Sequence, residues 1–154
     1  MTMKNKTAAR GFTLIEILIV IGIIAILAAI VIVAINPAKQ FAQARNTQRE
    51  SNINTLLNAI GQNMADNKGI FDCPGIGNDI DNATSTIGNG GGNSDLEDCL
   101  VPDYIPAMVM DPDGGSLSNT QYEVSVSDEG RYMICAIKAD EPAIPNSEEI
   151  CVLR

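Results

Sequence analysis

The sequence predicts an α+β protein in which a long N-terminal helix, half membrane-spanning and half amphipathic, packs on a small antiparallel sheet. Three observations give this prediction. Residues 17–35 hold no charged or polar side chain, residues 53–64 repeat apolar side chains at helical spacing, and residues 121–154 contain runs that alternate at strand spacing. A helix followed by antiparallel strands gives the α+β class.

The apolar segment is long enough to cross a bilayer. As a helix its 19 residues reach roughly 28 Å, close to a hydrocarbon thickness of about 30 Å. Just before it stands Glu16, and a carboxylate at bilayer depth costs about 2.5 kcal/mol or more. One interpretation is a plain single-pass anchor with Glu16 near the headgroups. The residues that precede the segment favour another.

A basic leader comes first. Residues 1–11 carry Lys4, Lys6 and Arg10 and no acid, so the positive-inside rule places the N-terminus in the cytoplasm. No cleavage site of the A-x-A type follows the apolar run, which argues against an ordinary secretory signal. The apolar run is therefore expected to stay on the mature protein.

The stretch Gly11-Phe12-Thr13-Leu14-Ile15-Glu16 resembles the processing motif of type IV prepilins and of type II secretion pseudopilins. The resemblance implies that prepilin peptidase cuts between Gly11 and Phe12 and that Phe12 becomes an N-methylated first residue. It also implies a pilin-like fold and assembly, by inner-membrane machinery, with copies of the chain or related pilins. In such a filament the Phe12 ammonium would be buried, and Glu16 is placed to offset its charge from a neighbouring subunit.

Cleavage would leave 143 residues, which suits one anchor helix and one small head. We expect five segments: a leader at 1–11, a transmembrane and polymerisation helix at 12–35, its amphipathic continuation at 36–68, a Gly-rich loop region at 69–120 and a sheet at 121–154.

Charge and composition exclude several functions. The net charge is −9 and three of the ten basic residues lie in the leader, so the mature chain is near −12. An acidic, aromatic-poor surface argues against direct nucleic-acid binding. The chain has no His, the commonest general base, and no spacing places a nucleophile beside a base. We expect no enzymatic activity.

The helix is expected to kink at Asn36-Pro37, because proline deletes a backbone hydrogen bond. Arg45 and Arg49 then fall on a stretch expected to be exposed, where they are either solvated or paired with acidic heads of neighbouring subunits. Asn67-Lys68-Gly69 is the predicted stop. The helix face that should pack on the sheet consists of Ile53, Leu56, Leu57, Ile60 and Met64.

Four cysteines lie on the side of the membrane predicted to be extracytoplasmic, where an even count indicates disulfides and three pairings exist. We prefer Cys73–Cys99, which closes a loop containing the flexible run 88–93, and Cys135–Cys151, which ties the last two strands. Those strands are predicted at 131–139 and 149–153, after a first strand at 121–127.

Asp111-Pro112-Asp113-Gly114, followed by Tyr122, is similar to a D-P-x-G…Y stretch of major pseudopilins, which bind calcium in a nearby loop. The resemblance suggests Asp111 and Asp113 as calcium ligands; no other cofactor is expected. The alternative is a Pro/Gly turn with solvated acids, because Gly115 stands where an EF-hand loop needs an oxygen ligand.

Two classes of function remain. The first is a filament subunit, of a type IV pilus or of a secretion pseudopilus; the second is a monomeric, membrane-anchored extracytoplasmic binding domain. Two disulfides and a Gly-rich loop favour a surface pilus, whereas the Asp111 stretch favours secretion. Either filament starts from a single-pass inner-membrane protein with a cytoplasmic N-terminus, in contact with the lipid bilayer, and ends at the cell surface or in the periplasm.

Overall fold

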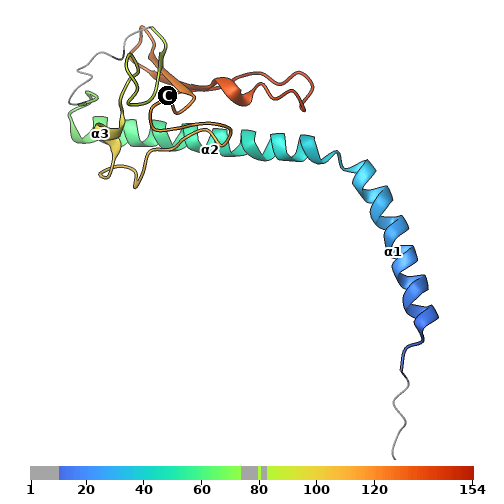
Figure 1. The fold of residues 1–154 in the computed structure, drawn as a ribbon. Helices are drawn as coiled ribbons and strands as arrows, with labels where there is room; N and C mark the ends of the chain where they lie inside the picture. Colours follow the sequence, from blue (N-terminus) through green and yellow to red (C-terminus); the bar gives the residue numbers. More distant parts are fainter. Residues whose placement is uncertain (1–10, 74–79, 81–82) are drawn as a thin grey trace, which may run out of the picture. The chain divides into compact units, whose positions relative to one another are not determined.

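The computed structural model describes residues 11–73, 80 and 83–154 (Figure 1). The chain divides into two compact units, Met1–Pro37 and Ala38–Arg154, which we describe separately. The leader lysines and Arg10 lie outside the described residues.

In the first unit, the described residues 11–37 form the helix α1 at Leu14–Ala34. None of its residues is buried. The sequence predicts a kink at Asn36-Pro37; instead α1 ends at Ala34, and the next helix, α2, begins at Pro37. Proline suits a first helical position, because the backbone N–H that it lacks would have no intrahelical partner there.

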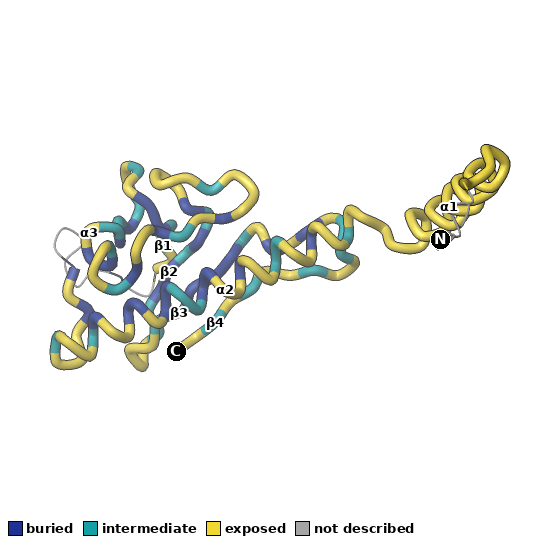
Figure 2. Tube along the Cα trace, turned by 90° about the horizontal axis from the view of Figure 1, so that it is seen from below, coloured by how far each residue is buried: buried dark blue, intermediate teal, exposed yellow. Residues whose placement is uncertain are grey.

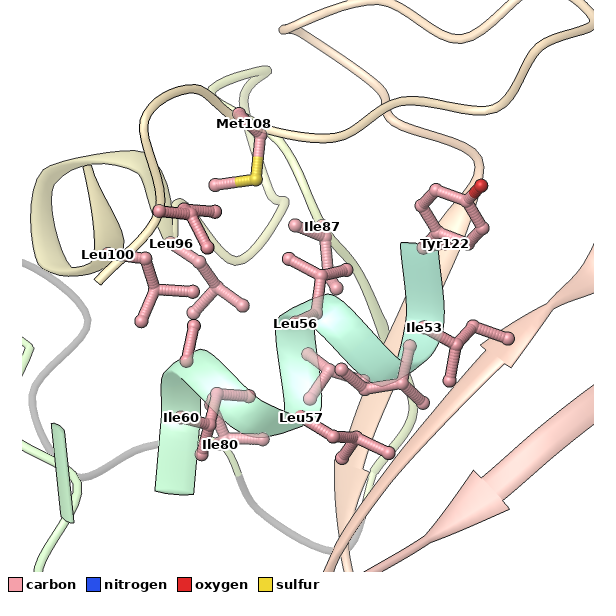
Figure 3. Packing of buried hydrophobic residues seen from close by; sticks show 14 of the residues in the cluster. Ile53, Leu56, Leu57, Ile60, Ile80, Ile87, Leu96, Leu100, Met108 and Tyr122 are labelled. Carbon is pink, nitrogen blue, oxygen red and sulfur yellow. The ribbon is translucent and has the colours of Figure 1, made fainter. Parts of the chain in front are cut away.

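The second unit, which we call the head, is built on α2 at Pro37–Asp66. Figure 2 shows buried residues along one side of α2 and exposed residues along the other. The predicted apolar face is confirmed: Ile53, Leu56, Leu57 and Ile60 are buried and Met64 packs against the same cluster. This cluster joins α2 to the loops and the sheet, as Figure 3 shows for ten labelled side chains.

Beyond α2 the chain forms a four-stranded antiparallel sheet in the order β1-β2-β3-β4. The strands are β1 Ser85–Thr86, β2 Tyr122–Val126, β3 Tyr132–Ala136 and β4 Ile150–Leu153. The predicted α+β fold is confirmed. Two details differ: β1 was not expected, and the strand predicted at 131–139 ends at Ala136, where the 3₁₀ helix η1 (Ile137–Ala139) begins.

The Gly-rich run 88–93 is more ordered than the sequence predicts. Asn89 N–H donates to Leu117 O at 2.9 Å, and Gly90 N–H donates to Ser118 O at 3.1 Å. A Cβ on Gly90 would lie 2.5 Å from that Ser118 oxygen. Glycine is therefore required here by the close approach of two backbones. A short helix, α3 at Glu97–Leu100, follows this loop.

Candidate assembly site

The start of α1 places Glu16 beside Thr13. Thr13 is the N-cap, and its backbone N–H and its hydroxyl each donate to Glu16 Oε2 at 2.8 Å. Glu16 N–H donates back to Thr13 Oγ1 at 3.3 Å, which completes a capping box. The carboxylate is thus held at the start of its own helix, four residues after Phe12.

The rest of α1 is an apolar surface on which no residue is buried. It is the one helix among the described residues that is long and apolar enough to cross a membrane. Its leucines, isoleucines and valines are at least half exposed within the single chain. Such a surface is stable only when lipid or other apolar helices cover it.

Residues 6–32 match the family model of the prokaryotic N-terminal methylation motif. The match covers the Gly11-Phe12 pair, Glu16 and most of α1, whose geometry is given above. The chain carries the prepilin motif of type IV pilins and pseudopilins. No curated protein sequence and no solved structure gives a significant match to the chain.

The prepilin motif implies processing by prepilin peptidase and assembly into pilin filaments. Together with α1 it indicates membrane anchoring, and it indicates a structural subunit rather than an enzyme.

In the head of this prepilin-motif protein, two arginines of α2 bind carboxylates that come from two different loops. Arg49 pairs with Asp111 through Nε–Oδ2 at 2.6 Å and Nη2–Oδ1 at 3.0 Å. Arg49 Nη1 also pairs with Glu141 Oε1 at 2.5 Å. Arg45 holds the same Glu141 carboxylate through Nε at 2.7 Å and Nη2 at 2.5 Å. The cluster therefore fastens both loops to the helix.

The position of Arg49 corrects the sequence-based expectation of exposure. Its side chain is completely buried, and its partners belong to its own chain. Burial alone would lower the pKa of Arg49, but hydrogen bonds with Asp111 and Glu141 outweigh burial and raise that pKa. Hydrogen bonds from Arg45, and then from Arg49, lower the pKa of Glu141 to about 2 against the opposing effect of burial.

The carboxylate of Asp111, which the sequence suggested as a calcium ligand, is bound by Arg49. Both of its carboxylate oxygens accept from Arg49, and Oδ1 also accepts from Asp113 N–H at 2.8 Å. Asp113 itself is exposed. The described part of the chain contains no group of three or more His, Cys, Asp or Glu side chains that could hold a metal ion. Calcium binding by Asp111 and Asp113 stays a prediction.

The four cysteines form two disulfides in the preferred pairing. Cys73 pairs with Cys99 across a Cα–Cα distance of 5.0 Å, and Cys135 pairs with Cys151 across 4.1 Å. The second disulfide joins directly opposite residues of β3 and β4.

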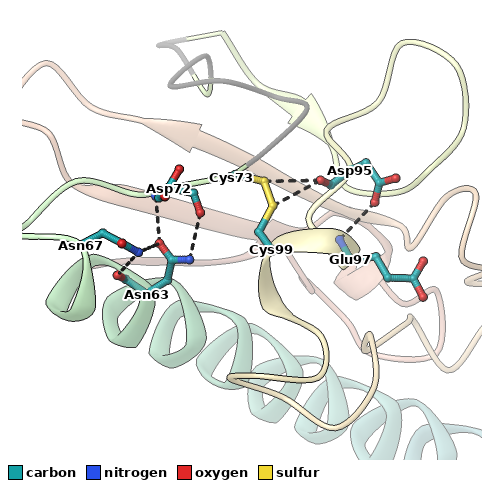
Figure 4. Close-up of a disulfide and its surroundings, with 7 residues drawn as sticks. All are labelled: Asn63, Asn67, Asp72, Cys73, Asp95, Glu97 and Cys99. Atoms are coloured by element: carbon teal, nitrogen blue, oxygen red, sulfur yellow. Dashed lines mark hydrogen bonds between the residues drawn. A yellow bond between two sulfur atoms is a disulfide. The ribbon is translucent and has the colours of Figure 1, made fainter.

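Figure 4 shows the surroundings of the first disulfide. The Asn63 side chain on α2 donates to Asp72 O at 3.0 Å and accepts from Asp72 N–H at 2.9 Å. These two hydrogen bonds hold Asp72, the residue before Cys73, against α2. The disulfide therefore connects Cys99 to a segment that is attached to α2.

Proposed function

We propose that this protein is a structural subunit of a type IV pilus-like filament, which assembles through α1 after prepilin peptidase cuts between Gly11 and Phe12. One observation carries the proposal. The prepilin motif at residues 6–32 includes most of the 21-residue helix α1, which is almost entirely apolar and has no buried residue. A chain with this motif assembles with further copies of itself, and the α1 helices of those copies would cover the exposed apolar surface.

In this proposal α1 is surrounded first by lipid and later by the helices of other subunits. In the inner membrane, lipid covers the helix, with the N-terminus cytoplasmic and the head extracytoplasmic. The two hydrogen bonds from Thr13 to Glu16 reduce the cost of holding that carboxylate near lipid before assembly. In the filament, the helices of other copies replace lipid, and the Phe12 ammonium of a neighbouring subunit becomes the partner of Glu16.

A type II secretion pseudopilin is the second candidate. Its support is the Asp111-Pro112-Asp113-Gly114 stretch, which is similar to that of major pseudopilins. The two candidates differ in where the filament ends: a pilus extends from the cell surface, whereas a pseudopilus stays in the periplasm.

The test is to shear filaments from cells that express the chain and to examine them by electron microscopy and mass spectrometry. A pilus predicts surface filaments whose subunit begins at N-methylated Phe12. A pseudopilin predicts no surface filament but a loss of protein secretion when the chain is deleted. A chain that keeps Met1 and remains monomeric in the membrane contradicts both candidates and supports the plain anchor.

A further inference from the structure

The head has an apolar hollow between the C-terminal half of α2 and the start of β3. Its volume is about 280 Å³. Two of the α2 residues that line it, Leu57 and Ile60, also belong to the buried cluster of the head (Figure 3). The apolar side chains in its lining are Leu57, Ile60, Met64 and Tyr132, and the charged ones are Arg131 and Arg154.

A second hollow, of about 230 Å³, shares Met64, Gly130 and Tyr132 with the first. Its other described lining residues are glycine or apolar, and one of them, Phe71, packs its ring edge-on against Tyr132 with the centroids 5.8 Å apart. We call the two hollows together the Tyr132 trough. Each volume lies slightly below the range of roughly 300–1,000 Å³ for small-molecule sites, so together they suit a small ligand.

The charge of the trough is opposite to that of the head around it. From residue 67 onward the sequence has 16 acids and four basic residues, a net charge of −12. None of the described residues that line the trough is acidic, and two of those four basic residues, Arg131 and Arg154, line it. Burial raises the pKa of Tyr132, so its phenol stays neutral as well. The trough therefore favours an anion.

Hydrogen bonds hold Arg154 at the edge of the trough. Its backbone N–H donates to Tyr132 O and its carbonyl accepts from Tyr132 N–H, each at 2.9 Å. Its guanidinium donates to the side-chain oxygen of Asn58 on α2. A guanidinium has five N–H donors, so Arg154 keeps donors for a ligand.

Arg131 is held less firmly. It pairs with Glu129 at 3.5 Å, and both side chains are more than half exposed. Exposed pairs of this kind are weak, so the carboxylate of a ligand can compete with Glu129 for Arg131.

The lining suits a ligand with one polar end and an apolar body. A bound peptide would bring an N–H and a C=O at every residue, and each of these groups needs a partner when it is buried. The trough offers mainly aliphatic and aromatic side chains, and the backbone of Tyr132 is already paired with Arg154. At the polar end, arginine binds a carboxylate through two parallel hydrogen bonds.

We propose that the Tyr132 trough binds a small aliphatic carboxylate, with its chain on the apolar lining and its carboxylate at Arg131 and Arg154. This site goes beyond the proposed filament function and does not depend on it.

The test titrates the full-length chain in detergent with hexanoate and follows the backbone amide NMR signals of Tyr132 and Arg154. Hexanol has the same chain without the charge, and acetate has the carboxylate without the chain. N-acetyl-leucyl-leucine represents a peptide partner with a carboxylate and apolar side chains. All four compounds are measured in the same detergent.

Variants of the lining locate the site. Gly61 lines the first hollow, and nothing lies within 4 Å of a Cβ placed on it, so Gly61→Leu occupies the hollow without a clash at Cβ. Leucine is also a better helix former than glycine, so α2 is retained. Gly91→Leu is the matched control, because Gly91 has equally open space but does not line the trough.

The charge is tested with Arg131→Gln and Arg154→Gln. Lys138→Gln is their control, since Lys138 is an exposed basic residue of the head that does not line the trough. The amide spectrum and disulfide pairing of each variant show that the head has folded.

We expect hexanoate to bind at least about tenfold more tightly than hexanol or acetate, because each of these lacks one half of the interaction. Gly61→Leu should weaken hexanoate binding at least about tenfold, and each arginine variant about fivefold or more. Gly91→Leu and Lys138→Gln should bind as the wild type does.

Equal binding of hexanol and hexanoate would overturn the proposal, as would unchanged binding by Gly61→Leu. A loss from Lys138→Gln equal to that from the arginine variants would also overturn it, because the charge effect would then be general. Tighter binding of N-acetyl-leucyl-leucine than of hexanoate would overturn the assignment to a small molecule and indicate a peptide partner.

Discussion

Arg49 and Asp111 form a two-point ion pair in which neither side chain is exposed to solvent. The residues are 62 positions apart in the sequence, one on α2 and the other in the D-P-D-G-G turn. That turn needs Gly115, where a Cβ would lie 2.4 Å from the Asp111 backbone nitrogen. The turn thus presents Asp111 to the helix.

Removal of Arg49 should destabilise the head strongly. Arg49→Met leaves the Asp111 carboxylate buried without a cation and removes one of the two arginines that bind Glu141. Removing one partner of a buried ion pair typically costs about 3–5 kcal/mol of stability. Denaturant unfolding of the full chain in detergent measures the loss. The control is Arg131→Met, because the Arg131–Glu129 pair is more than half exposed, at 56% and 69%; exposed pairs contribute about 0–1 kcal/mol. Equal losses from the two variants would contradict the account.

Glu141 should make the head sensitive to acid. Its pKa falls from 4.5 to about 2 on folding, so its contribution is complete above pH 4.5 and is lost as the pH falls towards 2. We expect the melting temperature of the wild type to fall across this window, and Glu141→Gln to be less stable at neutral pH but to change less with acid. Glu129→Gln, at an exposed position, should keep the wild-type slope. A Glu141→Gln slope equal to that of the wild type would show that another carboxylate controls the transition.

Gly90 should not tolerate a side chain. Gly90→Ala places its Cβ 2.5 Å from Ser118 O, and overpacking of this kind typically costs about 1–3 kcal/mol. Gly91→Ala is the matched control, since nothing lies within 4 Å of its Cβ. Thermal unfolding distinguishes them, and a Gly90→Ala chain as stable as Gly91→Ala would contradict the observed loop packing.

The two disulfides predict a specific peptide map. Non-reducing digestion should yield Cys73 linked to Cys99 and Cys135 linked to Cys151. Replacing Cys73 and Cys99 together by Ala should lower the free energy of unfolding by about 3.5 kcal/mol, the value that the chain-entropy model gives for a loop of this length. A peptide that links Cys73 to Cys135 would contradict the loop and sheet arrangement.

The features that could be predicted from the sequence depend on local patterns. Each predicted element can be recognised from residues that are close together in the chain. The examples are the apolar run 17–35, the helical spacing from Ile53 to Met64 and the alternation around Val124. Short elements and boundaries were predicted less accurately. The two-residue strand β1 was not expected, and β3 ends at Ala136, where η1 begins, instead of at residue 139. The prepilin motif could be read because all of its parts are contiguous.

The Arg49 cluster could not be derived, because its four charged side chains come from three segments that lie far apart in the sequence. One signal was present: Arg49 lies four residues before Ile53, on the side of the helix that carries the predicted apolar residues. A charge at such a position indicates a buried partner, but not which of the 19 acids supplies it. The order of the Gly-rich loop was missed for a similar reason, since Gly88 and Gly90 are required by Ser118, a residue outside the loop.

Filament yield from Glu16→Ala, in cells with no wild-type copy, tests the central claim most directly. The variant leaves the Phe12 ammonium without its partner in the filament, a loss of about 3–5 kcal/mol per buried pair. We predict normal membrane insertion, normal cleavage after Gly11, and little or no filament in the sheared pellet. Glu149→Ala, which removes an exposed acid of the head, should assemble as the wild type does. A normal amount of filament from Glu16→Ala would contradict the pairing of Glu16 with Phe12.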